Sequence, residues 1–183
     1  MGTVKKIEKP FSELHKIAVR VAKNIHLCDD VEHGRTIDKY GEIRKFSGDL
    51  DGVYIDVVQD TRIIVHNHPH KYKISNTFSY EDIYRFLTKK YLCEIIVSSY
   101  GYYYILRRGT YKGLSLEISN HAKELYFEIK DKVIKECSQN PDYRNLPLRT
   151  IRKKTNAALE LEYHKALKEF LTGKGLSYER CKI

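Results

Sequence analysis

A short histidine motif is the part of the sequence best suited to chemistry. His66 and His68 are separated by one residue and follow the strongly apolar residues 63–65. On an extended backbone, side chains two residues apart point to the same side, so both imidazoles can reach one metal ion. Asp82, in the first turn of a predicted helix, supplies a third ligand. Three protein ligands leave the fourth position of a tetrahedral zinc ion to water, which is the arrangement of a catalytic zinc site.

The Ser79-x-x-Asp82 pattern has two interpretations. Ser79 could cap the helix, with Asp82 near the positive end of the helix dipole, which stabilises the helix by about 1 kcal/mol and performs no chemistry. In a metal site, the Ser79 hydroxyl could instead donate a hydrogen bond to a developing oxyanion. A strand, His-x-His-Pro, a loop and a Ser-x-x-Asp helix form a constrained order, and their combination favours the metal site.

The elements around this motif predict an α+β core. Residues 11–25 have apolar side chains at helical spacing, and a helix starting near Tyr80 opens with the capping pattern. Residues 62–66 are nearly all apolar and predict a central strand buried on both faces. The remaining β-rich segments predict one hairpin over 32–38 and 41–46, a short strand over 53–58, and a second hairpin over 93–99 and 102–107.

The pattern changes to helix from Leu116. Residues 118–135 and 148–171 have helical patterns, separated by a break at 139–147 that contains Pro and Asn. The sequence therefore predicts a core over residues 1–110 and a helical extension over residues 111–183 that packs on the core.

Composition restricts the class of protein and its partners. The 183 residues carry 33 Lys and Arg against 24 Asp and Glu, a net charge of +9. The apolar runs are too short for a membrane helix, and the N-terminus is too polar for a signal peptide, so we expect a soluble, cytoplasmic protein. The four cysteines form no Cys-x-x-Cys pair, which argues against a zinc knuckle. The densest basic run, residues 148–154, suits either a solvated face or contact with nucleic acid or an acidic protein.

Residues 63–87, IIVHNHPHKYKISNTFSYEDIYRFL, resemble the signature of the JAB/MPN (JAMM) zinc metalloprotease family. The His-Asn-His-Pro form is most similar to the bacterial RadC-type and phage-associated branches. This resemblance implies a JAB/MPN-like (cytidine-deaminase-like) core that holds Zn²⁺ through His66, His68 and Asp82. It also implies Ser79 as the oxyanion support and a glutamate from an early strand as the general acid and base. Such enzymes are hydrolases that cleave peptide or isopeptide bonds, often at the C-terminus of ubiquitin or a ubiquitin-like protein, as deubiquitinases do.

The chain differs from the family pattern in two respects. Ten residues separate His68 from Ser79, which is longer than usual, and we expect His70 in this segment to be a loop residue and not a further ligand. The glutamate could be Glu32, which opens the first strand, or Glu42 on the returning strand. The position of Glu32 agrees better with the family, so we expect Glu32 to be the base.

Two other functions stay open at the level of sequence. One is a non-catalytic JAB-like scaffold in a phage or mobile-element assembly. The other is a basic protein associated with nucleic acid, for which the net charge would be the functional feature.

Overall fold

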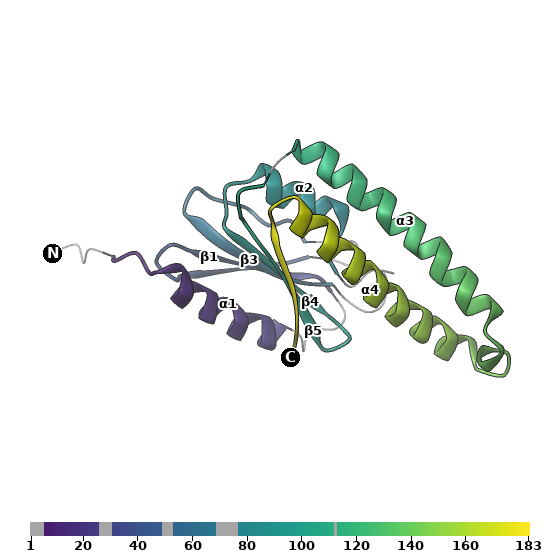
Figure 1. The fold of residues 1–183 in the computed structure, drawn as a ribbon. Coiled ribbons are helices and arrows are strands. Elements are labelled where there is room, and N and C mark those ends of the chain that lie inside the picture. The colour runs from purple at the N-terminus through teal and green to yellow at the C-terminus, as the bar shows by residue number, and fades with distance from the viewer. Residues whose placement is uncertain (1–5, 26–30, 49–52, 69–76, 112) are drawn as a thin grey trace.

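A mixed six-stranded β-sheet lies at the centre of the molecule, with α1 on one face and α2, α3 and α4 on the other (Figure 1). The computed structural model describes residues 6–25, 31–48, 53–68, 77–111 and 113–183. The strands lie in the order β2-β1-β3-β4-β5-β6. They are β1 His33–Asp38, β2 Ile43–Ser47, β3 Thr61–His68, β4 Cys93–Ser98, β5 Tyr102–Arg107 and β6 Ser177–Lys182. The helices are α1 Phe11–Ile25, α2 Tyr80–Thr88, α3 Ser115–Gln139, the short 3₁₀ helix η1 Pro141–Tyr143 and α4 Leu148–Gly173. The expected α+β class with a mixed sheet flanked by helices is confirmed.

Both predicted hairpins are present. In the turn between β1 and β2, Asp38 Oδ1 accepts hydrogen bonds from the backbone N–H groups of Tyr40 and Glu42, each at 2.9 Å. Gly41 in this turn has a φ of +86°, and Gly101 between β4 and β5 has a φ of +80°. Both values lie in the left-handed region, which glycine adopts without a steric penalty. The two antiparallel pairs therefore form where the turn residues indicated.

The parallel pair of β3 and β4 positions the histidine motif. His66 lies beside Ile96, and His68 lies beside Ser98, in the parallel register. Because parallel strands end at the same edge of a sheet, the helix that connects them begins at that edge. The first turn of α2, with Asp82, is therefore brought to the carboxyl end of β3.

Two separate clusters of buried apolar side chains cover the faces of the sheet. On one face, α1 packs through Leu14, Ala18, Ala22 and Ile25 against odd-numbered side chains of β3, such as Ile63 and Val65. On the other face, Ile64 packs with side chains from α2, α3 and α4. β3 is thus a central strand buried on both faces, as its apolar composition predicted.

The predicted strand over residues 53–58 is absent: this segment has neither helix nor strand. Its Ile55 side chain lies over Gly34 of β1, where an added Cβ would come within 2.7 Å of Ile55 Cδ1. The segment therefore covers the α2 face of the sheet through side-chain packing, and its apolar, β-branched residues serve the core without pairing with a strand.

Residues 113–183 form more than a pair of helices. α3 and α4 make an antiparallel hairpin on the α2 face, and the chain then returns as β6 along β5 (Figure 1). The helical extension expected over residues 111–183 contains the two long helices and, in addition, the unexpected strand β6, which completes one edge of the sheet. Its alternating polar residues make it a poor match to an apolar strand pattern, although Tyr178 is buried. Among the described residues, no helix is both long enough and apolar enough to cross a bilayer.

Candidate metal centre

Strand β3 places the two histidines on the same face of the sheet as Ile64. The alternation of side chains along a strand requires this placement, because His66 and His68 follow Ile64 at intervals of two residues. Both side chains are buried, with exposed fractions of 0% for His66 and 2% for His68. The β-branched residues 63–65 carry the strand through the core and deliver the imidazoles at its carboxyl end.

Three nitrogen and oxygen ligands converge at this edge of the sheet. His66 Nε2 lies 3.2 Å from His68 Nε2 and 3.4 Å from Asp82 Oδ1, and His68 Nε2 lies 3.4 Å from Asp82 Oδ2. Two ligand atoms that each lie about 2.1 Å from a tetrahedral zinc ion are about 3.4 Å apart. The spacing of the three side chains and their chemical types therefore fit a zinc ion.

Helix α2 holds Asp82 through a capping box. The Ser79 hydroxyl accepts a hydrogen bond from Asp82 N at 3.1 Å, and Asp82 Oδ2 accepts one from Ser79 N at 2.9 Å. The Ser79 hydroxyl also donates to Asp82 Oδ2 at 2.7 Å. The structure thus shows the capping interpretation of the Ser79-x-x-Asp82 pattern, and an oxyanion role for Ser79 stays a prediction.

The Asp82 carboxylate is charged in this environment. Burial disfavours the charged form, but the neighbouring His66 and Arg85 side chains outweigh this effect and hold the pKa of Asp82 well below its usual range. Arg85 Nη2 donates to Asp82 Oδ1 at 2.9 Å. A carboxylate that stays ionised across the physiological range is the form that binds a divalent cation.

Glu32 is the fourth buried group at the site. Its Oε1 atom lies 3.9 Å from His66 Nε2, and its exposed fraction is 5%. Glu32, His66 and His68 each offer a ligand atom within 4.8 Å of the others. Glu32 therefore lies close enough to exchange a proton with a water molecule at the centre.

The side chain of Asn67 fixes the backbone on both sides of Glu32. Asn67 Oδ1 accepts a hydrogen bond from His33 N at 2.6 Å, and Asn67 Nδ2 donates to Val31 O at 3.2 Å. These contacts extend the pairing of β1 and β3 beyond the last paired residues, Gly34 and His66. The residue between the two histidines thus positions the segment that carries the glutamate.

The other sequence candidates lie elsewhere or outside the described residues. Glu42 is exposed and forms an ion pair with Lys6, far from the buried histidines in the sheet. The structure therefore brings Glu32, and not Glu42, to the buried histidines. His70 belongs to residues 69–76, which lie outside the described residues.

A third carboxylate, Glu94 of β4, lies behind His66 and was missed by the sequence analysis. Its Oε1 atom lies 3.5 Å from His66 Nδ1, and its Oε2 atom accepts a hydrogen bond from Tyr91 OH at 2.5 Å. Arg85 Nη2 also donates to Glu94, so the guanidinium links Glu94 to Asp82. Glu94 is completely buried. A single charged residue inside the apolar segment 93–97 was the signal that could have revealed it.

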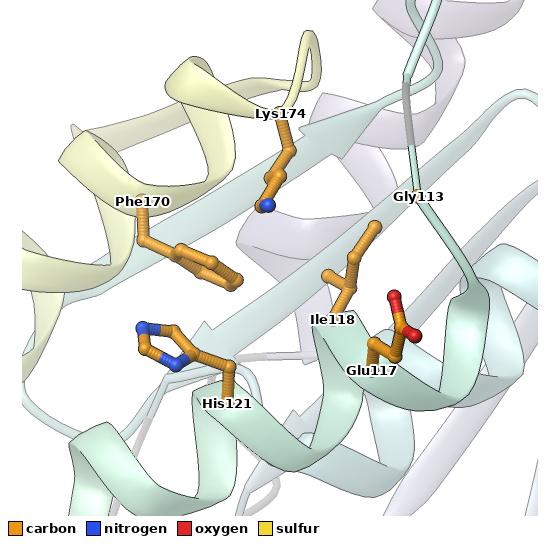
Figure 2. A pocket seen from close by; sticks show the side chains of 6 residues that line it. All are labelled: Gly113, Glu117, Ile118, His121, Phe170 and Lys174. Carbon is orange, nitrogen blue, oxygen red and sulfur yellow. The ribbon is translucent and has the colours of Figure 1, made fainter.

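A separate hollow, shown in Figure 2, is lined by residues from the start of α3 and the end of α4. It has a volume of about 440 Å³. Its lining residues are Gly113, Glu117, Ile118, His121, Phe170 and Lys174. None of the proposed metal ligands borders this hollow, so it is not part of the candidate metal centre.

Comparisons with protein-family models, with curated proteins and with solved structures gave no match to this chain. The chemistry must therefore be inferred from the geometry. Two imidazoles and one carboxylate at zinc-ligand spacing, with a further carboxylate beside them, are the groups needed to hold a metal ion and to move a proton next to it.

Proposed function

We propose that this chain is a zinc-dependent hydrolase of the JAMM type that cleaves a peptide or isopeptide bond, with a ubiquitin-like C-terminus as a candidate substrate. The observation that carries this proposal is the convergence of His66 Nε2, His68 Nε2 and the Asp82 carboxylate at 3.2 to 3.4 Å from one another. The burial of Glu32 beside His66 and His68 would add a general base.

The order of the elements supports a JAB/MPN-like core as part of this proposal. A first helix, a hairpin opened by Glu32, the His-x-His strand and the Ser-x-x-Asp helix follow one another along the chain. The same order was expected from the resemblance of residues 63–87 to the family signature. In this proposal, α3, α4 and β6 are additions to the core.

His66, His68 and Asp82 would hold the zinc ion. When bound, zinc lowers the pKa of a coordinated water and polarises the carbonyl of a substrate. The Glu32 carboxylate would accept a proton from the attacking water and deliver it to the nitrogen of the leaving amine. The amide C–N bond then breaks, and the products are a carboxylate and an amine.

The Ser79 hydroxyl would support the oxyanion formed during the attack. Its hydrogen bond to Asp82 Oδ2 occupies its proton in the described arrangement, so this role requires the hydroxyl to turn towards the substrate. Ser79 is only partly buried, which gives it room to turn.

A non-catalytic scaffold is the second candidate, and the burial of the site favours it. Glu32 and Asp82 each have an exposed fraction of 5%, and the histidines have still less. A metal ion bound there without access for a substrate would stabilise the fold and do nothing else.

Metal analysis together with a substrate assay separates these functions. Purified protein should contain close to one zinc per chain, and His68→Ala should remove it. A panel of fluorogenic peptide and ubiquitin-like substrates should then detect hydrolysis by the wild-type protein but not by Glu32→Gln, which keeps the shape of the side chain and loses the base. Zinc-free protein with all ligands intact would overturn the hydrolase and leave the scaffold. Zinc-loaded protein without activity on any substrate would favour the scaffold.

A further inference from the structure

The far end of the α3–α4 hairpin carries most of the net charge of the chain. We call residues 130–154 the hairpin tip; it comprises the end of α3, η1 and the start of α4. The tip holds eight Lys and Arg against three Asp and Glu, a net charge of +5 out of the total of +9. The first turn of α4 contains no acidic residue that would offset this charge. The tip is therefore a concentrated positive surface.

The cations of the hairpin tip are available to a partner. Among the described residues, Lys132 is the only one of these cations that forms an ion pair, with Glu136 at 4.0 Å. The exposed cations are Lys132, Lys135, Arg144, Arg149, Arg152, Lys153 and Lys154. Lys154 lies over the Tyr143 ring and Lys130 over the Phe127 ring, but the described residues contain no ion pair for Lys135, Arg144, Arg149, Arg152 or Lys153.

The hairpin tip also has a hollow, which is lined by apolar and aromatic side chains and by Ser138, Asn140, Arg144 and Thr155. Its volume is about 380 Å³, and its walls include Ile134, Cys137, Tyr143 and Ile151. Ile134 is 47% exposed, and Leu148 at the start of α4 is 84% exposed. Apolar side chains at the centre of a cationic surface resemble the centre and rim of a protein interface.

The hairpin tip extends beyond the edge of the sheet that carries the metal centre. Glu160 of α4 accepts a hydrogen bond at 3.1 Å from Ser98, which lies beside His68 in the sheet. Leu148 lies twelve residues before Glu160, which corresponds to about 18 Å of helix. Figure 1 shows the hairpin projecting past the strands at this end. A partner bound at the tip would therefore lie on the same side of the molecule as the proposed active site.

We propose that the hairpin tip is a docking surface for an acidic protein segment that inserts an apolar side chain into the hollow. Asp and Glu of the segment pair with the cations of the tip, and an aliphatic or aromatic side chain contacts Ile134 and Ile151. The charge of the tip selects acidic partners, and the hollow fixes their register.

The hollow favours a protein segment over a nucleic acid. Phosphate groups would use the cations, but a nucleic-acid backbone gains nothing from exposed aliphatic side chains such as Ile134 and Leu148. A protein segment uses both features. The two partners therefore differ in their response to the removal of an apolar side chain.

Fluorescence anisotropy with a defined probe tests the proposal. The probe is a short fluorescein-labelled peptide of Asp and Glu with a central pair of leucines, and a second peptide replaces the leucines with serine. Arg149→Glu combined with Lys153→Glu should weaken binding by about 10-fold or more. Lys16→Glu combined with Lys23→Glu is the matched control, because it makes the same change in net charge on α1, on the opposite face of the sheet.

The apolar part of the proposal has its own variant. Ile134→Ser should weaken binding of the leucine peptide about 3-fold to 10-fold and leave binding of the serine peptide unchanged. Leu116→Ser, at an exposed position at the start of α3, should have no effect. Equal losses in the two charge-reversal variants would overturn the docking surface. Tighter binding of a single-stranded DNA oligonucleotide, insensitive to Ile134→Ser, would show that the partner is a nucleic acid.

This proposal does not depend on the hydrolase proposal. Anisotropy detects binding without catalysis, and His68→Ala, which removes a proposed metal ligand, should bind the probe as the wild-type protein does. Wild-type protein that binds the probe but contains no zinc and has no activity would contradict only the hydrolase. Failure of the probe to bind a zinc-loaded, active protein would contradict only the docking surface.

Discussion

The Nδ1 atom of His66 lies 3.5 Å from Glu94 Oε1, while the Nε2 atom of the same ring faces His68 and Asp82. A carboxylate behind a metal-binding imidazole holds the proton on the nitrogen that faces away from the metal. His66 Nδ1 forms no hydrogen bond within the described chain, so Glu94 acts on it as a nearby charge at ion-pair distance. With zinc bound as proposed, the ring would present its unprotonated Nε2 atom to the ion. Glu94 is itself fixed by hydrogen bonds from Tyr91 and Arg85. We infer that Glu94 orients His66 and selects its tautomer.

Glu94→Gln should weaken zinc binding. The amide keeps the size of the carboxylate but loses the charge that orients His66, so we expect zinc affinity to fall about 10-fold to 100-fold. Competition with a chromogenic chelator measures this change. The free energy of unfolding should also fall by about 1 to 3 kcal/mol, because Arg85 loses a charged acceptor.

Tyr91→Phe is the control for this prediction. It removes the hydrogen bond to Glu94 Oε2 but leaves the carboxylate that faces His66. Its effect on zinc affinity should be smaller than that of Glu94→Gln. Equal zinc affinity in Glu94→Gln and wild type would show that Glu94 has no role in orienting His66.

Asn67→Ala should separate positioning of Glu32 from binding of the metal. The substitution removes both side-chain hydrogen bonds to the backbone at Val31 and His33, while His66 and His68 stay on their strand. We expect zinc content to be retained and kcat to fall about 10-fold or more, because a misplaced base costs rate and not metal affinity. Zinc analysis and steady-state kinetics on the same preparation measure both. Loss of zinc together with activity would mean that Asn67 supports the whole site.

The fold was largely predictable from local patterns. The helix at Tyr80 and the hairpins at Gly41 and Gly101 were each encoded by a capping or turn motif of a few residues. The structure of residues 53–58 was not predictable in this way. Their apolar side chains pack on the sheet without strand pairing, as the packing of Ile55 over Gly34 shows. β6 was missed because its place in the sheet depends on pairing with β5, about 75 residues earlier in the chain.

Only the site residues that belong to one sequence motif could be predicted. His66, His68, Asp82 and Ser79 lie in a single segment of characteristic order. Glu94, by contrast, contributes through a register between two parallel strands, which depends on the assembled sheet. The sequence favoured Glu32 over Glu42 only through the family resemblance, because the physical difference between them depends on which strand of the hairpin pairs with β3.

Substitutions at Ser79 should distinguish a helix cap from an oxyanion donor. Ser79→Ala should lower the free energy of unfolding by about 1 kcal/mol, because the hydrogen bond to Asp82 N is lost. Ser79→Asn should restore most of this stability, since Asn is also a good N-cap. Thermal unfolding and kcat are measured for both variants. If kcat falls in Ser79→Ala and recovers together with stability in Ser79→Asn, Ser79 acts only as a helix cap. If kcat falls about 100-fold in both variants, Ser79 stabilises the oxyanion.

Glu32→Gln and Glu42→Gln form a matched pair for the general base. Each removes one negative charge from the same hairpin region, but only Glu32 is buried beside His66. We expect Glu32→Gln to lower kcat by at least about 100-fold and Glu42→Gln to leave it within a factor of about two. The opposite result would assign the base to Glu42 and contradict the geometry of the site.

His164 should make the protein sensitive to mild acid. It is half-buried on α4 against Tyr104 and Tyr178, with ring centroids 5.5 and 5.3 Å away. Burial, together with the charge of Arg180, lowers the pKa of His164 from 6.5 to about 4 in the folded state. Because the unfolded chain binds this proton first, the contribution of His164 to stability is complete above about pH 6.5 and is lost as the pH falls towards 4.

Chemical denaturation at pH 7 and pH 4 tests this linkage in wild type and His164→Gln. Wild type should lose more of its free energy of unfolding over this interval than the variant, by about 1 to 2 kcal/mol, which allows for solvent screening of the half-exposed ring. Gln is similar in size to His and does not titrate, so the pH dependence caused by all other groups should be the same in wild type and His164→Gln. Identical losses in the two proteins would show that the folded chain accepts the proton on His164 as readily as the unfolded chain does.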